Sequence, residues 1–122
     1  MFFLLWCLGW VGVAVLSLLP LAVPGYHGSD KVLHALGYAG MAAGAVTFCR
    51  DPVRLALLAL LATAVGGAVE IAQGYVGRDA SVLDAAADGV GAAIGYAVAL
   101  VTLLLLRTVL RRSPLQDSPS PG

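Results

Sequence analysis

Six polar side chains stand in three pairs at helical spacing inside apolar stretches of this 122-residue chain. Residues three or four positions apart share one face of a helix, so each pair presents its polar groups together. An ionised group in an apolar helix costs up to about 3 kcal/mol unless it is paired or hydrated. The spacing therefore predicts that the pairs face one another. They are Lys31 and His34, Glu70 and Gln73, and Asp84 and Asp88.

These residue types favour proton transfer and the binding of an anion. His34 and Glu70 are the candidate catalytic acid and base, because imidazole and carboxyl side chains commonly transfer protons in enzymes. Lys31 and Arg78 would hold a phosphate or carboxylate group of a substrate. The other candidate substrate-binding residues are Gln73, Asp84 and Asp88.

A metal ion is an alternative use of the same side chains. A divalent cation among Glu70, Asp84, Asp88 and His34 is chemically reasonable, because carboxylates favour hard cations. Their spacing matches no defined metal motif, however. We therefore predict no metal and no cofactor.

The composition excludes an ordinary soluble domain. Hydrophobic residues make up 60% of the chain and charged residues 11%, against about 45–50% and 25% in globular proteins. A soluble domain this small has too much surface to hide so many apolar side chains. Nucleic-acid binding is also disfavoured, because seven basic residues are balanced by seven acidic ones.

We predict an all-α integral membrane bundle of four transmembrane helices. Each of four apolar stretches approaches the length of about 20 residues that spans a bilayer. The stretches are residues 2–19, 32–48, 52–73 and 82–106. The first is either a retained span or a cleaved signal peptide, and the absence of a charged region before Trp10 favours the retained span.

Local signals predict how these helices begin, end and pack. Asp51 is the expected N-cap of the third helix, with Pro52 at its first position. Gly74 is the expected left-handed residue at its end. Ser81 and Asp84 resemble a capping box at the start of the fourth helix. Two small-residue motifs predict close helix packing: Gly40-x-x-x-Gly44 and Gly91-x-x-x-Gly95.

Charge asymmetry predicts the orientation. Five arginines flank one side of the four stretches, whereas only Lys31 and Arg78 are basic on the other side. The positive-inside rule then places both termini in the cytoplasm and the paired polar residues at the outer surface. The first stretch has no ionisable side chain apart from Cys7, so we expect it to contribute only apolar contacts. Cys7 and Cys49 are expected to act as small apolar packing residues.

The ordered motifs resemble those of the VanZ-like membrane proteins. That family shows D-K-x-x-H at the start of one span, E-x-x-Q near the end of the next, and a G-R loop before D-x-x-x-N-x-x-G. Here Asp30-Lys31-x-x-His34, Glu70-x-x-Gln73 and Gly77-Arg78 match in order over residues 28–100. Asp88 departs from the pattern, because it stands where Asn is common.

The resemblance implies a VanZ-like four-span domain over residues 1–112. The last ten residues, 113–122, contain three prolines and three serines and are expected to form a disordered cytoplasmic tail. The resemblance also implies a multi-pass protein of the bacterial plasma membrane and a link to glycopeptide (teicoplanin) resistance. The expected partners are membrane lipids, with a lipid-linked envelope precursor or a glycopeptide as ligand, and no nucleic acid. Two alternatives stay open: an accessory protein whose charges form an ion-pair network, and an ion-coupled transporter with Glu70 as its proton-binding group.

The orientation can be tested by cysteine labelling in a variant without Cys7 and Cys49. Cysteines placed at Gly28 and Gly77 should react with a membrane-impermeant thiol reagent in intact cells, because both positions are expected outside. A cysteine at Ser118 should react only after the cells are lysed. Labelling of Ser118 alone in intact cells would show that the orientation is reversed.

Overall fold

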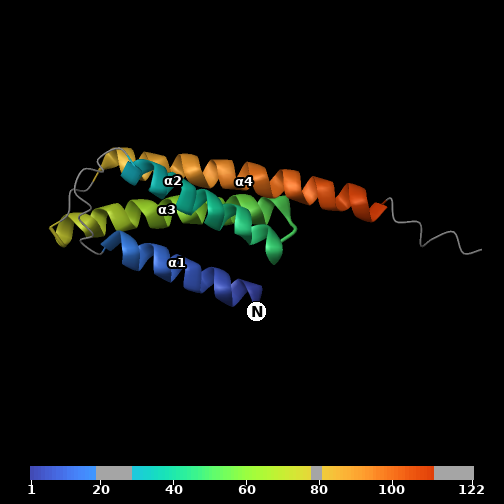
Figure 1. The fold of residues 1–122 in the computed structure, drawn as a ribbon, viewed down its shortest axis with the longest axis horizontal. Coiled ribbons are helices and arrows are strands. Elements are labelled where there is room, and N and C mark those ends of the chain that lie inside the picture. Colours follow the sequence, from blue (N-terminus) through green and yellow to red (C-terminus); the bar gives the residue numbers. More distant parts are fainter. Residues whose placement is uncertain (19–28, 78–80, 112–122) are drawn as a thin grey trace, which may run out of the picture.

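The computed structural model describes residues 1–18, 29–77 and 81–111, and all regular structure within them is helical. The helices are α1 (Phe2–Leu18), α2 (Ser29–Gly44), α3 (Pro52–Tyr75) and α4 (Val82–Arg111). A short 3₁₀ turn, η1 (Ala45–Thr47), follows α2. The helices run alongside one another, with α2 between α1 and α4 in Figure 1 and α4 extending beyond the others at its C-terminal end.

The all-α class is confirmed, and two of the helices have the dimensions of membrane spans. By length and composition α3 and α4 could each cross a bilayer, whereas the apolar α1 has 17 residues and α2 has 16. Four membrane spans and the orientation of the chain stay predictions.

The C-terminal ends of α2 and α4 differ from the expected boundaries. The second helix ends at Gly44, although the apolar sequence continues to Phe48. The rings of Trp6 and Phe48 lie 5.3 Å apart, so the η1 segment packs against α1 and does not extend α2. At the other end of the chain, α4 continues past Leu106 to Arg111, where a cation stabilises the C-terminal end of the helix dipole.

The start of α3 is confirmed and its end is corrected. Asp51 Oδ1 accepts hydrogen bonds from the backbone N–H groups of Val53 (2.8 Å) and Arg54 (3.0 Å). The bond from Arg54 contributes most to holding the pKa of the Asp51 carboxyl below its ordinary value. Gly74 lies within the helix, and the left-handed position belongs to Gly77, whose φ is +79°.

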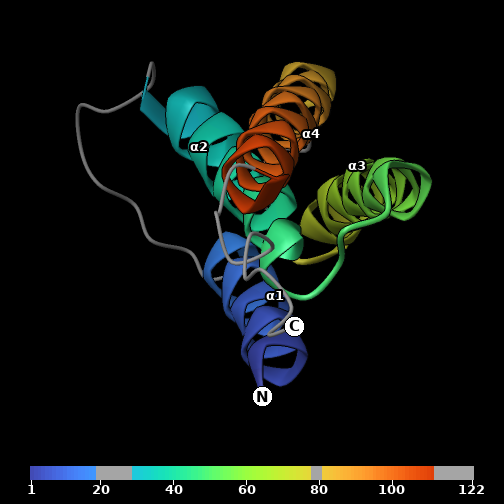
Figure 2. The same cartoon turned by 90° about the vertical axis from the view of Figure 1, so that its right-hand side faces the viewer.

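Small residues form the closest contact in the bundle, between α2 and α4. A Cβ added at Gly91 would overlap the carbonyl oxygen of Ala35, and one added at Gly95 would overlap that of Ala39. This confirms the predicted role of Gly91-x-x-x-Gly95. The companion motif has no such role, because a Cβ at Gly40 would meet no atom within 4 Å. Figure 2 shows α4 against α2, with α3 and α1 on separate sides.

The expectation that α1 makes only apolar contacts is wrong. The indole N–H of Trp6 donates a 2.7 Å hydrogen bond to the carbonyl oxygen of Met41, and the side chain of Gln73 donates to that of Ser17. The backbone of α1 therefore carries a polar acceptor that side-chain hydropathy does not reveal. Cys7 and Cys49 are free and partly buried, in agreement with a packing role.

The distribution of side chains is the reverse of that in a soluble protein. The buried residues of α3 and α4 are mostly small or polar, and they include Glu70, Gln73, Asp84 and Asp88. Large aliphatic side chains face outward instead, among them Leu57, Leu60, Ile71, Leu104 and Leu105.

The contact between α2 and α4 can be tested with a pair of glycine variants. Gly91→Ala should lower the free energy of unfolding in mixed detergent micelles by about 1–3 kcal/mol, because the methyl group forces the two backbones apart. Gly40→Ala is the matched control and should lose no stability, because the added methyl group meets open space. Equal stability of the two variants would contradict this packing.

Candidate functional site

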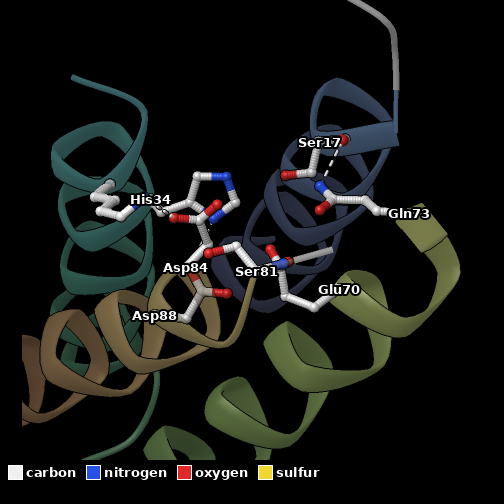
Figure 3. Close-up of polar contacts among 8 residues, drawn as sticks. Ser17, His34, Glu70, Gln73, Ser81, Asp84 and Asp88 are labelled. Carbon is white, nitrogen blue, oxygen red and sulfur yellow. Dashed lines mark hydrogen bonds and ion pairs between the residues drawn. The ribbon is translucent and has the colours of Figure 1, made fainter. Parts of the chain in front are cut away.

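Five ionisable side chains converge at the end of the bundle where α2 and α4 begin and α3 ends, and four of them are labelled in Figure 3. We call them the polar cluster. Glu70, Asp84 and Asp88 are buried, with 5%, 7% and 1% of their surface exposed. The cluster comprises Lys31, His34, Glu70, Asp84 and Asp88.

His34 and Asp88 form the central contact of the polar cluster. Nδ1 of His34 lies 3.0 Å from Oδ1 of Asp88, and only 10% of the His34 side chain and 1% of the Asp88 side chain are exposed. When Asp88 is ionised, its carboxylate can only accept, so Nδ1 carries the proton of this hydrogen bond. The pair therefore fixes both the orientation of the imidazole ring and the position of one of its protons.

Two glycines place Asp88 in this position. Gly91 lies one helical turn after Asp88 and lets α4 touch α2 at Ala35, the residue next to His34. Gly66 of α3 lies on the other side, where an added Cβ would come within 2.6 Å of Asp88 Oδ2. The carboxylate of Asp88 thus fills the space that a side chain at position 66 would need.

Glu70 reaches the start of α4. Its Oε2 accepts a 2.9 Å hydrogen bond from the backbone N–H of Ser81, while Oε1 is buried without a hydrogen-bond partner. In a capping box, the side chain of Asp84 would accept from this N–H group. That expectation is wrong, because a carboxylate from the neighbouring helix α3 takes the place of Asp84.

Asp84 instead pairs with Lys31 at the rim of the polar cluster. Nζ of Lys31 lies 2.9 Å from Asp84 Oδ1. The atoms are close enough for an ion pair, although their alignment does not make a hydrogen bond. The Lys31 side chain is 41% exposed and that of Asp84 11%. Lys31 is therefore the member of the cluster that a ligand from outside can reach most easily.

Gln73 lies apart from the polar cluster, and one other predicted site residue is not described by the structure. The side-chain amide of Gln73 is 3% exposed and donates a 2.8 Å hydrogen bond to the carbonyl oxygen of Ser17. Gln73 therefore joins the end of α3 to the end of α1. Its role in substrate binding stays a prediction. Arg78 lies outside the described residues.

Two further residues shape the site: Gly66 had no predicted role, and the place of Tyr38 could be predicted only in part. Gly66 stands four residues before Glu70, and this spacing on a face that carries a carboxylate could have marked it as a contact position. Tyr38 is 1% exposed and lies one turn after His34, with its phenol within electrostatic range of Asp88 and Glu70. Its position one turn from His34 was visible in the sequence, but its proximity to these carboxylates was not.

Two cavities lie elsewhere in the bundle. One of about 510 Å³ is lined by Phe48, Arg50, Arg54 and neighbouring residues at the opposite end, and one of about 200 Å³ lies between Trp6, Trp10 and α3. The polar cluster lines neither of them. Within it, His34 contacts Asp88 and Lys31 contacts Asp84, while a carboxylate oxygen of Glu70 lies within 4.8 Å of His34 and Asp88.

The polar cluster combines the groups needed for proton transfer with those needed to hold an ion. An imidazole oriented by a carboxylate is the arrangement with which many enzymes move protons. One ligand atom each from His34, Glu70 and Asp88 also lies within 4.8 Å of the other two.

Comparison with protein-family models, with curated proteins and with solved structures finds no match to this chain.

The Lys31–Asp84 pair can be tested by a double-mutant cycle. Lys31→Met should lower the free energy of unfolding by about 1–2 kcal/mol, because it leaves the largely buried Asp84 carboxylate unpaired while the exposed lysine end of the pair limits the loss. Asp84→Asn should cost less, because Lys31 can turn toward solvent. The double variant should be more stable than Lys31→Met alone. Additive losses in detergent unfolding would show that the two groups do not interact.

Proposed function

We propose that this chain is a multi-pass membrane protein with four spans and both termini in the cytoplasm. The outward-facing leucines and the buried carboxylates support this, because lipid favours apolar surfaces and polar groups must be satisfied inside the bundle. The shorter α1 and α2 complete the bundle around α3 and α4. Because α1 and α2 are short, they cross the bilayer where it thins locally and where their flanking residues extend to its surface.

The charges of the two ends agree with this orientation. Arg50, Arg54 and Arg107 gather at the end opposite the polar cluster, where Arg107 donates a 3.3 Å hydrogen bond to the carbonyl oxygen of Arg50. An arginine-rich end belongs at the cytoplasmic face. The polar cluster then lies at the outer leaflet.

The function that fits best is a site that binds or acts on an anionic, lipid-linked substrate of the cell envelope. The observation that carries this proposal is the burial of three carboxylates beside a partly buried histidine, at the end where three otherwise apolar helices meet. Ionisable residues inside membrane helices are costly, so they usually serve a function. A lipid-linked substrate reaches such a site laterally, with its anionic headgroup at the depth of the polar cluster.

Each residue has a role in this proposal that follows from its position. Lys31 attracts the phosphate or carboxylate of the substrate, because it is the exposed cation of the cluster. His34 transfers a proton, and Asp88 is its positioning residue, because Asp88 holds the imidazole ring at Nδ1. Glu70 is the second proton-transfer group, since its Oε1 is directed into the cluster without a partner.

The resemblance to VanZ-like proteins supports the same proposal. The motif residues Lys31, His34 and Glu70 are members of the polar cluster. Asp88, which departs from the family pattern, adds a negative charge at the centre of the site. By this resemblance we propose a role in the cell envelope that alters susceptibility to glycopeptide antibiotics.

A structural ion-pair network is the second candidate, and the Lys31–Asp84 contact favours it. Such a network would fix the rotation of the helices without binding a substrate. Transport has less support, because carrier sites usually lie near the middle of the membrane, whereas the cluster lies at one end of the helices (Figure 1).

Substitutions in the polar cluster distinguish a site from a structural network. Glu70→Gln and His34→Ala should abolish the glycopeptide phenotype of an expressing bacterium and the binding of a polyprenyl phosphate to the purified protein. Their abundance in the membrane should stay at the wild-type level, because Gln keeps the shape of Glu70 and Ala at position 34 introduces no new polar group. Bound lipid is measured by native mass spectrometry and abundance by quantitative immunoblotting.

Asp51→Asn is the matched control for these variants. It changes a carboxylate to an amide at the far end of α3, where Asn also caps a helix well. It should retain both binding and phenotype. If Glu70→Gln and His34→Ala lose abundance in step with the phenotype, the structural network is the correct interpretation, because breaking a buried pair costs about 3–5 kcal/mol.

A further inference from the structure

Among the described residues, two carboxylate oxygens of the polar cluster are buried with neither a hydrogen bond nor an ion pair. They are Oε1 of Glu70 and Oδ2 of Asp88, whereas Oδ1 of Asp84, which also lacks a hydrogen bond, pairs with Lys31. Glu70 and Asp88 are 95% and 99% buried, so solvent does not satisfy their two oxygens. Native proteins rarely leave such groups unpaired, and an ion or water that binds them is the usual explanation.

We infer that His34, Glu70 and Asp88 bind a divalent transition-metal ion, with Zn²⁺ as the best fit. One ligand atom from each residue lies within 4.8 Å of the other two, and the three side chains come from α2, α3 and α4 and point toward one another (Figure 3). One imidazole nitrogen with two carboxylate oxygens suits Zn²⁺, and also Mn²⁺, better than the all-oxygen preference of Ca²⁺ and Mg²⁺.

The charge of the polar cluster supports a divalent ion. Three buried carboxylates, Glu70, Asp84 and Asp88, face a single lysine, which already pairs with Asp84. When all are ionised, Glu70 and Asp88 leave two negative charges against a neutral His34. One divalent cation balances these charges in a region where an unpaired charge is strongly disfavoured.

The distances need only small adjustments. Zn–N and Zn–O bonds are about 2.1 Å long, so two atoms bound to one ion lie at most about 4.2 Å apart. The 3.0 Å between His34 Nδ1 and Asp88 Oδ1 is already in this range, so an ion can take the place of the proton that they share. Glu70 must then move inward slightly, which is possible because its side chain is long and its Oε1 is not held by a hydrogen bond.

This inference revises the sequence-based expectation of no metal and does not depend on the proposed substrate. Metal binding is measured separately from lipid binding and from the antibiotic phenotype. Either the metal inference or the proposed function can therefore fail while the other holds. An ion held by three protein ligands keeps a further coordination position open. At that position it would supply a binding point for an anionic oxygen.

Metal binding can be measured on the full-length protein in detergent after removal of metals with a chelator. We expect one equivalent of Zn²⁺ per chain, an increase in thermal stability on its addition, and release of protons into a weakly buffered solution. Mn²⁺ should compete with Zn²⁺ only in excess, because such sites bind Mn²⁺ more weakly, whereas Ca²⁺ and Mg²⁺ at the same excess should not compete. Failure of the folded wild-type protein to bind Zn²⁺ would overturn the inference, and the orphan oxygens would then be satisfied by protons or water.

Substitutions of the three ligands distinguish Zn²⁺ binding at this site from Zn²⁺ binding elsewhere on the protein. His34→Gln, Glu70→Gln and Asp88→Asn should each weaken binding by at least about tenfold, the effect that even an indirect contact to a metal can have. Asp84→Asn is the control inside the polar cluster, because Asp84 pairs with Lys31 and is not one of the three ligands. Cys7→Ala/Cys49→Ala should bind with unchanged stoichiometry.

A Co²⁺ spectrum keeps the test decisive where a variant does not fold. Co²⁺ added to the Cys7→Ala/Cys49→Ala protein should give visible absorption bands of a low-symmetry nitrogen and oxygen site, and Zn²⁺ should abolish them. A spectrum identical to that of hydrated Co²⁺ would contradict the site. So would undiminished Zn²⁺ binding by a folded Asp88→Asn or Glu70→Gln protein.

Discussion

The contact between the backbones of α2 and α4 determines the geometry of the polar cluster. Gly91 and Gly95 lie directly against the carbonyl groups of Ala35 and Ala39, so no side chain separates the two helices there. His34 precedes Ala35, and Asp88 lies one turn before Gly91. The same contact that brings the helices together therefore sets the 3.0 Å distance between His34 and Asp88. In the proposed membrane setting, helices with aliphatic outer surfaces gain little by associating, so close packing of this kind would hold them together.

On the opposite side of Asp88, Gly66 allows α3 to approach α4 closely. It leaves room for the carboxylate of Asp88, and it lies one turn before Glu70 on the same face of α3. As a result Glu70 reaches the first residues of α4, where it accepts the N–H group of Ser81. Glycines on α3 and α4 thus govern how deeply the carboxylate of Asp88, on α4, is buried. Packing and electrostatics cannot be separated here, because a methyl group at position 66 or 91 would move the charges as well as the backbones.

Local patterns predicted the helical class, the Asp51 cap and the small-residue contact at Gly91 and Gly95, because each depends on neighbours in the chain. The end of α2 could not be predicted, since hydropathy continues unchanged to Phe48 and the turn is stabilised by Trp6, far away in the sequence. The hydrogen-bond partners of the buried polar side chains could not be predicted from the sequence either. Gln73 binds a backbone carbonyl of α1, and Glu70 replaces Asp84 at the Ser81 N–H group. Both outcomes depend on the rotation of whole helices, which residue spacing does not determine.

The polar cluster has two layers with different degrees of pairing. At the rim, Asp84 and Lys31 form a pair whose charges balance, which is what a purely structural network would show. Asp88 lies four residues further along α4, about 6 Å deeper, and there each of two carboxylates keeps an unpartnered oxygen. A network that served only to fix helix register would gain by pairing or removing these groups, because unsatisfied buried charges are destabilising. The unpartnered carboxylate oxygens of the deeper layer therefore favour a ligand that binds between the helices. The Lys31–Asp84 pair at the rim would support the structure around that ligand.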